Sequence, residues 1–192
     1  MNKARFHTFG CKLNSYETEM MQALCTAEGL EHAVIINTCA VTAEAVRKAK
    51  KTIRRTYREN PYKKIIVTGC AAQIEPETFN SMNEVSFVIG NEEKLSQTIW
   101  NKIQAKSETT DLISKVAVNN IMDVKKINPR PIAKLAQRSR AYVQIQNGCD
   151  HRCTFCVIPF GRGNSRSVSA EKVLNQIQFL VDNGFKEIVL TG

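Results

Sequence analysis

The sequence contains no long hydrophobic run, and this absence excludes one class of protein. No stretch approaches the roughly 18 consecutive apolar residues that a membrane-spanning helix requires. The first residues, Met1 to His7, also lack the apolar core of a secretory signal peptide. We therefore expect no membrane association and place the protein in the cytoplasm.

Acidic residues are scarce relative to basic ones. The chain has 18 Asp and Glu against 27 Lys and Arg, which gives a net charge of +9 at neutral pH. Hydrophobic residues make up 43% of the chain, so it can bury a core and is unlike a disordered protein. The excess of positive charge favours a polyanionic partner, with nucleic acid first.

The chain has seven cysteines, an odd number, in a protein too large to need disulfide bonds for stability. This combination indicates a reducing compartment, in which cysteines more often bind metal or react. A disulfide-stabilised secreted protein is therefore excluded.

Short apolar runs alternate with segments of helical spacing in the amino-terminal half. This alternation predicts an α/β domain over residues 1–105, with a parallel sheet, covering helices and right-handed crossovers. The predicted strands are Arg5–Phe9, Val34–Thr38, Lys64–Thr68 and Val85–Ile89, and the predicted helices are Tyr16–Ala27, Glu44–Arg58, Pro76–Asn80 and Glu92–Gln104.

Residues 106–135 are predicted as a linker region. Lys106–Thr110 is polar, Ile113–Lys126 is expected to add extended pieces, and Pro129-Arg130-Pro131 breaks regular structure. A second α/β unit is predicted over 136–192. Because two parallel strands and one helix do not form a stable sheet alone, we expect this unit to be truncated after its second strand. Its predicted elements are the strand Arg140–Gln146, the helix Ser169–Asn183 and the strand Lys186–Thr191.

Cys149, Cys153 and Cys156 form the pattern Cys-x3-Cys-x2-Cys directly after a predicted strand. Three thiols in so polar a loop cannot be explained by core packing. A zinc site with His151 as fourth ligand is the alternative, although zinc sites usually space their ligand pairs more widely. Three cysteines on a four-iron cluster leave one iron open for a substrate or cosubstrate. The spacing favours such a cluster.

The remaining cysteines are Cys11, Cys25, Cys39 and Cys70. Cys25 lies within a predicted helix and is most simply a small buried hydrophobe. Each of the other three follows a predicted strand, and ligands of parallel sheets bind beyond the carboxyl ends of the strands. Gly10 and Gly69 would let the backbone turn sharply there. The pattern predicts a second three-thiol site, with three unrelated core cysteines as the alternative.

The Cys-x3-Cys-x2-Cys pattern, with Phe155 before its last cysteine, resembles the signature of the radical S-adenosylmethionine (SAM) superfamily. The resemblance implies that the open iron binds SAM, that one electron cleaves SAM to a 5′-deoxyadenosyl radical, and that Phe155 lies near the adenine. It also implies a partial (βα)6 barrel, of which only the first two strands are present here.

The two cysteine triads together resemble the methylthiotransferase family. The likeness implies that Cys11, Cys39 and Cys70 hold a second 4Fe-4S cluster that takes part in sulfur delivery. Sulfur and a methyl group are then inserted at an unactivated C–H bond, with a sulfur donor and a one-electron reductant as partners. The stretches that carry the likeness are Thr8–Asn14, Asn37–Cys39, Thr68–Gln73, Gln146–Pro159 and Gly161–Ser167.

Phe-Gly-Cys-Lys-Leu-Asn and Phe-Gly-Arg-Gly-Asn-Ser-Arg-Ser look most like the branch that modifies N6-threonylcarbamoyladenosine beside the tRNA anticodon. The isopentenyladenosine branch usually has Gln-Met-Asn after the first cysteine, and the branch acting on a ribosomal-protein aspartate has Pro-Lys-Asn. A non-catalytic iron–sulfur electron carrier and a zinc-stabilised RNA-binding module stay open as alternatives. We expect the 192-residue chain to be inactive alone, although the whole protein is an enzyme.

Basic residues gather in two places that suit an anionic partner. Arg162 and Arg166 follow the cysteine loop and would neutralise a SAM carboxylate or an RNA phosphate, unless they are plain surface arginines. The predicted helix after Glu44 would track tRNA phosphates, unless it is only a solvated face. Its segment contains Arg47, Lys48, Lys50, Lys51, Arg54, Arg55, Arg58, Lys63 and Lys64, opposed by Glu44 and Glu59.

Overall fold

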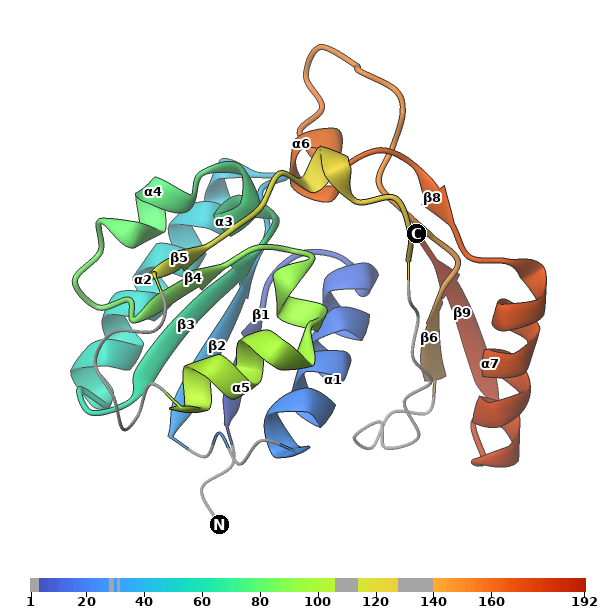
Figure 1. The fold of residues 1–192 in the computed structure, drawn as a ribbon, viewed down its shortest axis with the longest axis horizontal. Coiled ribbons are helices and arrows are strands. Elements are labelled where there is room, and N and C mark those ends of the chain that lie inside the picture. Colours follow the sequence, from blue (N-terminus) through green and yellow to red (C-terminus); the bar gives the residue numbers. More distant parts are fainter. Residues whose placement is uncertain (1–3, 28–29, 31, 106–113, 128–139) are drawn as a thin grey trace.

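A sheet of five parallel strands forms the centre of the amino-terminal unit (Figure 1). The computed structural model describes residues 4–27, 30, 32–105, 114–127 and 140–192. The first four strands fall on the four predicted runs, which confirms the α/β class. In sheet order the strands are β1 (Arg5–Thr8), β2 (Ala33–Thr38), β3 (Lys64–Gly69), β4 (Phe87–Ile89) and β5 (Val116–Ala117).

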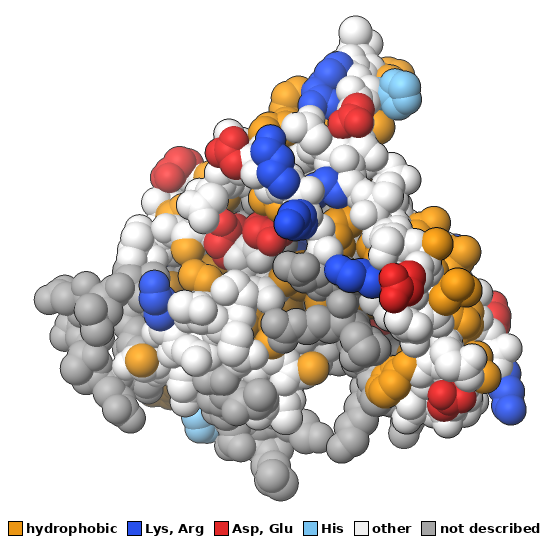
Figure 2. Space-filling view, turned by 45° about the vertical axis from the view of Figure 1, so that its right-hand side comes forward, with side chains coloured by type: hydrophobic (Ala, Val, Ile, Leu, Met, Phe, Trp, Pro, Cys, Tyr) orange, Lys and Arg blue, Asp and Glu red, His pale blue; other side chains and the backbone are white. Residues whose placement is uncertain are grey.

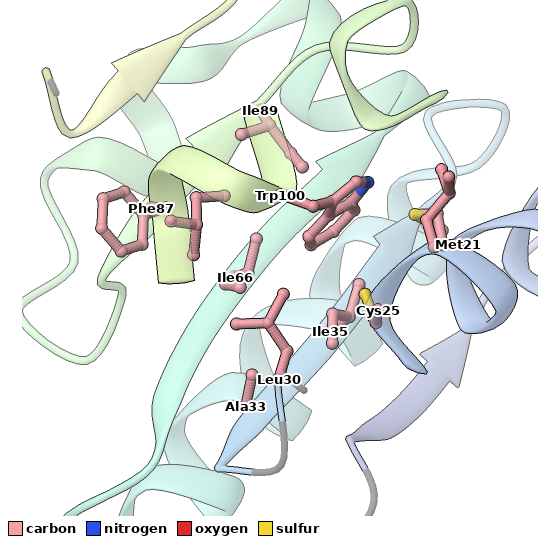
Figure 3. Close-up of a cluster of buried hydrophobic side chains, with 11 residues drawn as sticks. Met21, Cys25, Leu30, Ala33, Ile35, Ile66, Phe87, Ile89 and Trp100 are labelled. Atoms are coloured by element: carbon pink, nitrogen blue, oxygen red, sulfur yellow. The ribbon is translucent and has the colours of Figure 1, made fainter. Parts of the chain in front are cut away.

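Helices cover both faces of this sheet. On one face, α1 and α5 bury a core with Ile35 and Ile66, in which Trp100 is the largest fully buried side chain (Figure 3). On the other face, α2, α3 and α4 pack on Val34 and Ile65. Because successive strand residues point to opposite faces, the unbroken apolar runs of β2 and β3 contribute side chains to both cores. The helices are α1 (Lys12–Ala27), α2 (Ala43–Glu59), α3 (Cys70–Ile74), α4 (Pro76–Asn80) and α5 (Gln97–Ala105).

The placement of the helices corrects one prediction about the connections. Strands β1, β2 and β3 are neighbours in chain order, so the first two crossovers move in the same direction across the sheet. Helix α1 packs on the face of Ile35, whereas α2 packs on the opposite face, so the two crossovers have opposite hands. The prediction that all crossovers are right-handed is therefore wrong for the crossovers on one face of the sheet, which α1 and α5 share. Helix α1 lies where its other side can bury Leu13 and Tyr16 with Tyr142 of the second unit.

The second unit contains a two-stranded parallel sheet of β6 (Arg140–Gln144) and β9 (Glu187–Thr191). Helix α7 (Ala170–Asp182) packs on it through Leu180. The cysteine loop and α6 (Ile158–Arg162) lie between these strands in sequence, and the loop is closed at its base by the antiparallel pair β7 (Gln146–Asn147) and β8 (Arg166–Ser167). Hydrophobic side chains gather on the side of the molecule that carries α7 and β9 (Figure 2). The large exposed hydrophobic residues of these two elements are Leu174, Val181 and Leu190.

Several element boundaries differ from those predicted. Helix α1 begins at Lys12 rather than Tyr16, directly after the first cysteine of the triad. The predicted helix Glu92–Gln104 is divided into a single 3₁₀ turn, η1 (Glu93–Leu95), and α5. The short helices α3 and α6 were not predicted, because five residues carry too little periodicity to identify a helix.

The predicted linker region contributes to the first unit. Its described part adds β5 to the sheet edge and then forms the turn η2 (Ile121–Asp123). Lys106–Thr110, Pro129-Arg130-Pro131 and the predicted start of the second unit at residue 136 lie outside the described residues. Within the described part of the chain, no helix has the length and apolar character that a bilayer crossing demands.

Candidate functional site

Three of the predicted ligand cysteines lie at one edge of the first sheet. Cys11 follows β1, Cys39 comes directly after β2, and Cys70 comes directly after β3 as the first residue of α3. These strands pair in parallel register, so their carboxyl ends meet at the same edge. Cys25 lies elsewhere, in the core beneath α1, where burial raises the pKa of its thiol to about 12. Its assignment as a buried hydrophobe is confirmed.

Two glycines let the backbone approach this edge closely. Gly10 and Gly69 have φ angles of +99° and +96°. A Cβ atom on Gly10 would lie 2.8 Å from the Sγ of Cys39, and one on Gly69 would lie 2.3 Å from the carbonyl oxygen of Thr38. Any side chain would therefore combine an unfavourable φ with a steric clash. Only glycine fits at either position.

Buried polar side chains fix the strand ends beneath the cysteines. The amide of Asn14 donates to the carbonyl oxygens of Phe9 at 2.7 Å and Thr38 at 3.0 Å, which joins the first two cysteine loops. The hydroxyl of Thr38 donates to the carbonyl oxygen of Thr68 at 2.6 Å and accepts from the backbone N–H of Ala72 at 3.2 Å. These bonds tie β1, β2, β3 and α3 into one frame, which positions the three thiols.

The three thiols also act on one another electrostatically. Burial is the main cause that raises the pKa of the Cys39 thiol, and the neighbouring Cys70 and Cys11 raise it further. The guanidinium of Arg162 opposes this rise. Thiolates gathered in this way repel one another, and a bound cationic metal centre relieves that repulsion. The arrangement therefore favours metal ligation over three separate structural cysteines.

We call Cys11, Cys39 and Cys70 the first triad, and Cys149, Cys153 and Cys156 the second triad. The second triad lies in a loop that projects beyond α6 (Figure 1). Cys153 is exposed, and Cys149 and Cys156 are partly exposed. The guanidinium of Arg152 closes the loop on itself by donating to the carbonyl oxygen of Cys149 at 2.7 Å and to the Oδ1 of Asn164 at 2.6 Å. The backbone of the loop is thus held while its thiols stay accessible to a cluster and a cosubstrate.

Helix α6 brings the second unit against the first triad. A Cβ atom on Gly161 would lie 3.0 Å from the Cβ of Cys70, so the two backbones are in close contact. The side-chain amide of Asn91 donates both to the carbonyl oxygen of Gly161 and, at 3.6 Å, to the Sγ of Cys70. Since Gly161 follows Cys156 by only five residues, this contact joins the first triad to the segment that directly follows the second triad.

Buried charged side chains lie next to the contact between α6 and the first triad. Glu17 pairs with Lys94 at 2.7 Å and with Arg162, and their side chains are 1%, 0% and 4% exposed. Arg162 also donates to Asn14, and Lys94 donates to the Oδ1 of Asn91 at 2.6 Å. Burial favours the neutral acid, but Arg162 and Lys94 together hold the pKa of Glu17 below its usual value. The carboxylate is therefore ionised between two cations.

The donor chemistry of both triads fits 4Fe-4S clusters. Cysteine thiolates are the usual ligands of such clusters, and each triad leaves one iron open. Among the described residues, no three His, Cys, Asp or Glu side chains are placed to hold a single metal ion. A cluster does not require such a placement, because its thiolates bind separate irons. His151, the ligand of the zinc alternative, is exposed in the loop.

Comparison with known proteins agrees with this division of the chain. Residues 3–90 match the family model "Uncharacterized protein family UPF0004", and residues 143–192 match "Radical SAM superfamily". The chain is 46% identical to the threonylcarbamoyladenosine tRNA methylthiotransferase MtaB of Rickettsia prowazekii, over 96% of this chain and 42% of the relative. It is 39% identical to MtaB of Bacillus subtilis, over 100% of this chain and 44% of that protein.

A relative from another branch is also similar. The tRNA-2-methylthio-N(6)-dimethylallyladenosine synthase of Thermodesulfovibrio yellowstonii is 31% identical, over 96% of this chain and 44% of that protein. The chain belongs to the radical SAM methylthiotransferase family. That membership implies SAM and a 4Fe-4S cluster as cofactors. The chain spans less than half the length of these relatives.

Not every residue around the two cysteine sites was predicted. Arg162 and Arg166 are 3% and 8% exposed, so the alternative that they are plain surface arginines is wrong. Their role toward a SAM carboxylate or an RNA phosphate stays a prediction. Glu17, Asn91 and Lys94 were missed. The available signal was the position of Glu17, which helical spacing places on the same side of α1 as Leu13, Met20 and Met21.

Two further predicted features are exposed. Phe155 is 89% exposed beside the second triad, and its contact with adenine stays a prediction. Helix α2 presents basic side chains to solvent along its length, although Glu44 pairs with Arg47 and Lys48. Lys64 does not belong to this face, because it lies on β3 and donates to the carbonyl oxygen of Ile103. The exposed basic residues of α2 are Arg47, Lys48, Lys51, Arg54, Arg55 and Arg58.

Proposed function

We propose that this methylthiotransferase converts N6-threonylcarbamoyladenosine, next to the anticodon of tRNA, to its 2-methylthio derivative. The observation that carries the proposal is the contact between the first triad and the second unit, in which Asn91 bonds both to Cys70 and to Gly161 of α6, five residues after Cys156. Attaching sulfur at an unactivated carbon needs a radical source and a sulfur source at the same substrate. We infer the tRNA substrate from the names of the MtaB relatives.

Each triad would hold one four-iron cluster. Bound there, the clusters supply the one-electron chemistry that generates a 5′-deoxyadenosyl radical from SAM at one site and carry sulfur at the other. The chain's own residues position both groups: Arg152 closes the loop of the SAM-binding triad, and Asn14 joins two loops of the other triad. Phe155 offers an exposed aromatic face to the adenine. The set of ligands is Cys149, Cys153 and Cys156 for one cluster and Cys11, Cys39 and Cys70 for the other.

The tRNA would bind through its phosphates to the exposed basic residues of α2. Arginine and lysine side chains on one helix face neutralise phosphates and release counterions, so this binding weakens as salt rises. A one-electron reductant and a sulfur donor are required partners of the reaction, and we place the reaction in the cytoplasm. A non-catalytic electron carrier would need neither a second triad nor a tRNA-binding face.

Mass spectrometry of tRNA nucleosides from cells lacking this protein tests the proposal. We expect the 2-methylthio derivative to disappear while N6-threonylcarbamoyladenosine accumulates. The gene for the whole protein should restore the derivative, whereas a version with Cys149, Cys153 and Cys156 replaced by alanine should not. Loss of methylthiolated isopentenyladenosine instead would assign the protein to that branch, and an unchanged nucleoside profile would refute the proposal.

A further inference from the structure

The buried side chains of Glu17, Asn91 and Lys94 lie beside Cys70 and form more than a simple ion pair. Lys94 donates from Nζ to Glu17 at 2.7 Å, to Asn91 at 2.6 Å and to Asn37 at 3.5 Å. Three acceptors around one nitrogen match the three donors of an ammonium group. With its Oδ1 held by Lys94, the amide of Asn91 must turn its N–H groups toward the Sγ of Cys70. Lys94 therefore orients a hydrogen bond to a ligand thiol.

The charges of this group do not cancel. Lys94 and Arg162 contribute two positive charges, and Glu17 contributes one negative charge. The excess of one positive charge is buried, where it is screened far less than at the surface. Burial lowers the pKa of Lys94 and acts against the protonated form of Arg162, whereas Glu17 and, after it, Cys70 favour the protonated form of both residues, and Cys11 favours that of Arg162. The charges of this group therefore interact with the triad. The sulfur ligands thus lie in a positive local field.

We propose that Asn91, Lys94 and Arg162 are positioning residues that raise the reduction potential of the cluster held by Cys11, Cys39 and Cys70. Hydrogen bonds to ligand sulfur and nearby positive charge both favour the more negative, reduced state of a cluster. Glu17 acts in the opposite direction, since it cancels half of the positive charge. The inference rests on the proposed function in one respect, namely that this triad ligates a cluster.

A redox titration on the whole protein, followed by electron paramagnetic resonance, tests the inference. The parent variant carries alanine in place of Cys149, Cys153 and Cys156, so that only the cluster of the first triad contributes. In this background we expect Asn91→Asp and Lys94→Met to shift the midpoint potential downward and Glu17→Gln to shift it upward. Asn91→Asp keeps an oxygen for Lys94 but replaces the N–H donor by a carboxylate, so it removes the bond to sulfur and adds a negative charge, and both changes lower the potential.

The signs of the shifts distinguish this role from general support of the fold. The double variant Glu17→Gln/Lys94→Met should have a potential between those of the single variants. As a matched control, Lys102→Met removes an exposed lysine from α5 and should leave the potential unchanged. Should Lys94→Met fail to fold, Asn91→Asp and Glu17→Gln still give opposite expected signs.

The possible results separate the two proposals. A cluster with the same potential in all variants, or shifts of one sign only, would overturn the inference and leave the proposed function intact. Absence of any cluster in the parent variant would overturn both, because the first triad would then not be a ligand set. Opposite shifts in the expected directions would support the inference, since loss of structural support has no reason to move the potential upward.

Discussion

The two cysteine triads of this chain are built in opposite ways. Cys149, Cys153 and Cys156 lie within eight residues of one exposed loop, which is closed by its own hydrogen bonds. Cys11, Cys39 and Cys70 come from three strand ends, 28 and 31 residues apart, and meet only because the strands pair. One triad therefore depends on local chain geometry, whereas the other depends on the complete sheet. The comparison predicts that a substitution can remove the metal from one triad and leave the other triad unaffected.

The largest expected effect separates the chemistry of the triads. Replacing Cys11, Cys39 and Cys70 together with alanine should preserve reductive formation of 5′-deoxyadenosine, because the loop proposed to bind SAM is unchanged, yet abolish the methylthiolated nucleoside. Both products can be quantified by chromatography from one anaerobic reaction of the whole protein with threonylcarbamoylated tRNA. Cys25→Ala is the control, since this cysteine lies in the core. A normal yield of methylthio product from the triple variant would make the first triad structural.

The next effect concerns metal content. Alanine at Cys149, Cys153 and Cys156 should leave about half of the reconstituted iron, because one of the two proposed clusters loses its ligands. Iron analysis together with the visible absorbance of the anaerobic protein measures this directly. Complete loss of iron, or no loss, would contradict independent sites.

A backbone substitution should affect only the sheet-borne triad. Gly69→Ala places a Cβ atom 2.3 Å from the carbonyl oxygen of Thr38 at a φ of +96°. We expect the free energy of unfolding to fall by about 1–3 kcal/mol or more, with loss of iron from the first triad. Gly184→Ala is the matched control, because its φ is +88° but no atom lies within 4 Å of the added Cβ. Equal effects of the two substitutions on iron content would contradict the role of the close approach.

The smallest effect is expected at α2, away from both triads. If Arg54, Arg55 and Arg58 contact phosphates, glutamine at these positions should weaken tRNA binding and reduce the salt slope by roughly 1 per lost contact. Binding titrations of the whole protein at several salt concentrations give this slope. Lys102→Gln on α5 serves as the control, because α5 covers the other face of the sheet. A slope that stays the same would mean that this face of α2 is only solvated.

The strands and the positions of the cysteines were predictable from the sequence because both depend on local patterns. Continuous apolar runs identify β2 and β3, and a cysteine after each strand end predicts where the thiols lie. The buried charge group was not predictable in the same way. Glu17 and Arg162 are 145 residues apart, and no periodicity links them. The hand of the crossovers was also missed, because the apolar runs of β2 and β3 supply both cores and do not indicate which face α1 covers.

The pairing of Glu17 with Arg162 restricts how the two units can be exchanged with those of relatives. A chimera that joins the amino-terminal unit to a radical SAM unit without this arginine would bury Glu17 with Lys94 alone and leave Asn14 without its cationic partner. Removing one member of a buried ionic group commonly costs about 3–5 kcal/mol, a large fraction of the stability of a domain. The two units are therefore interchangeable only as a matched pair, and recombination within the family would be tolerated at their junction only when both sides of this contact are inherited together.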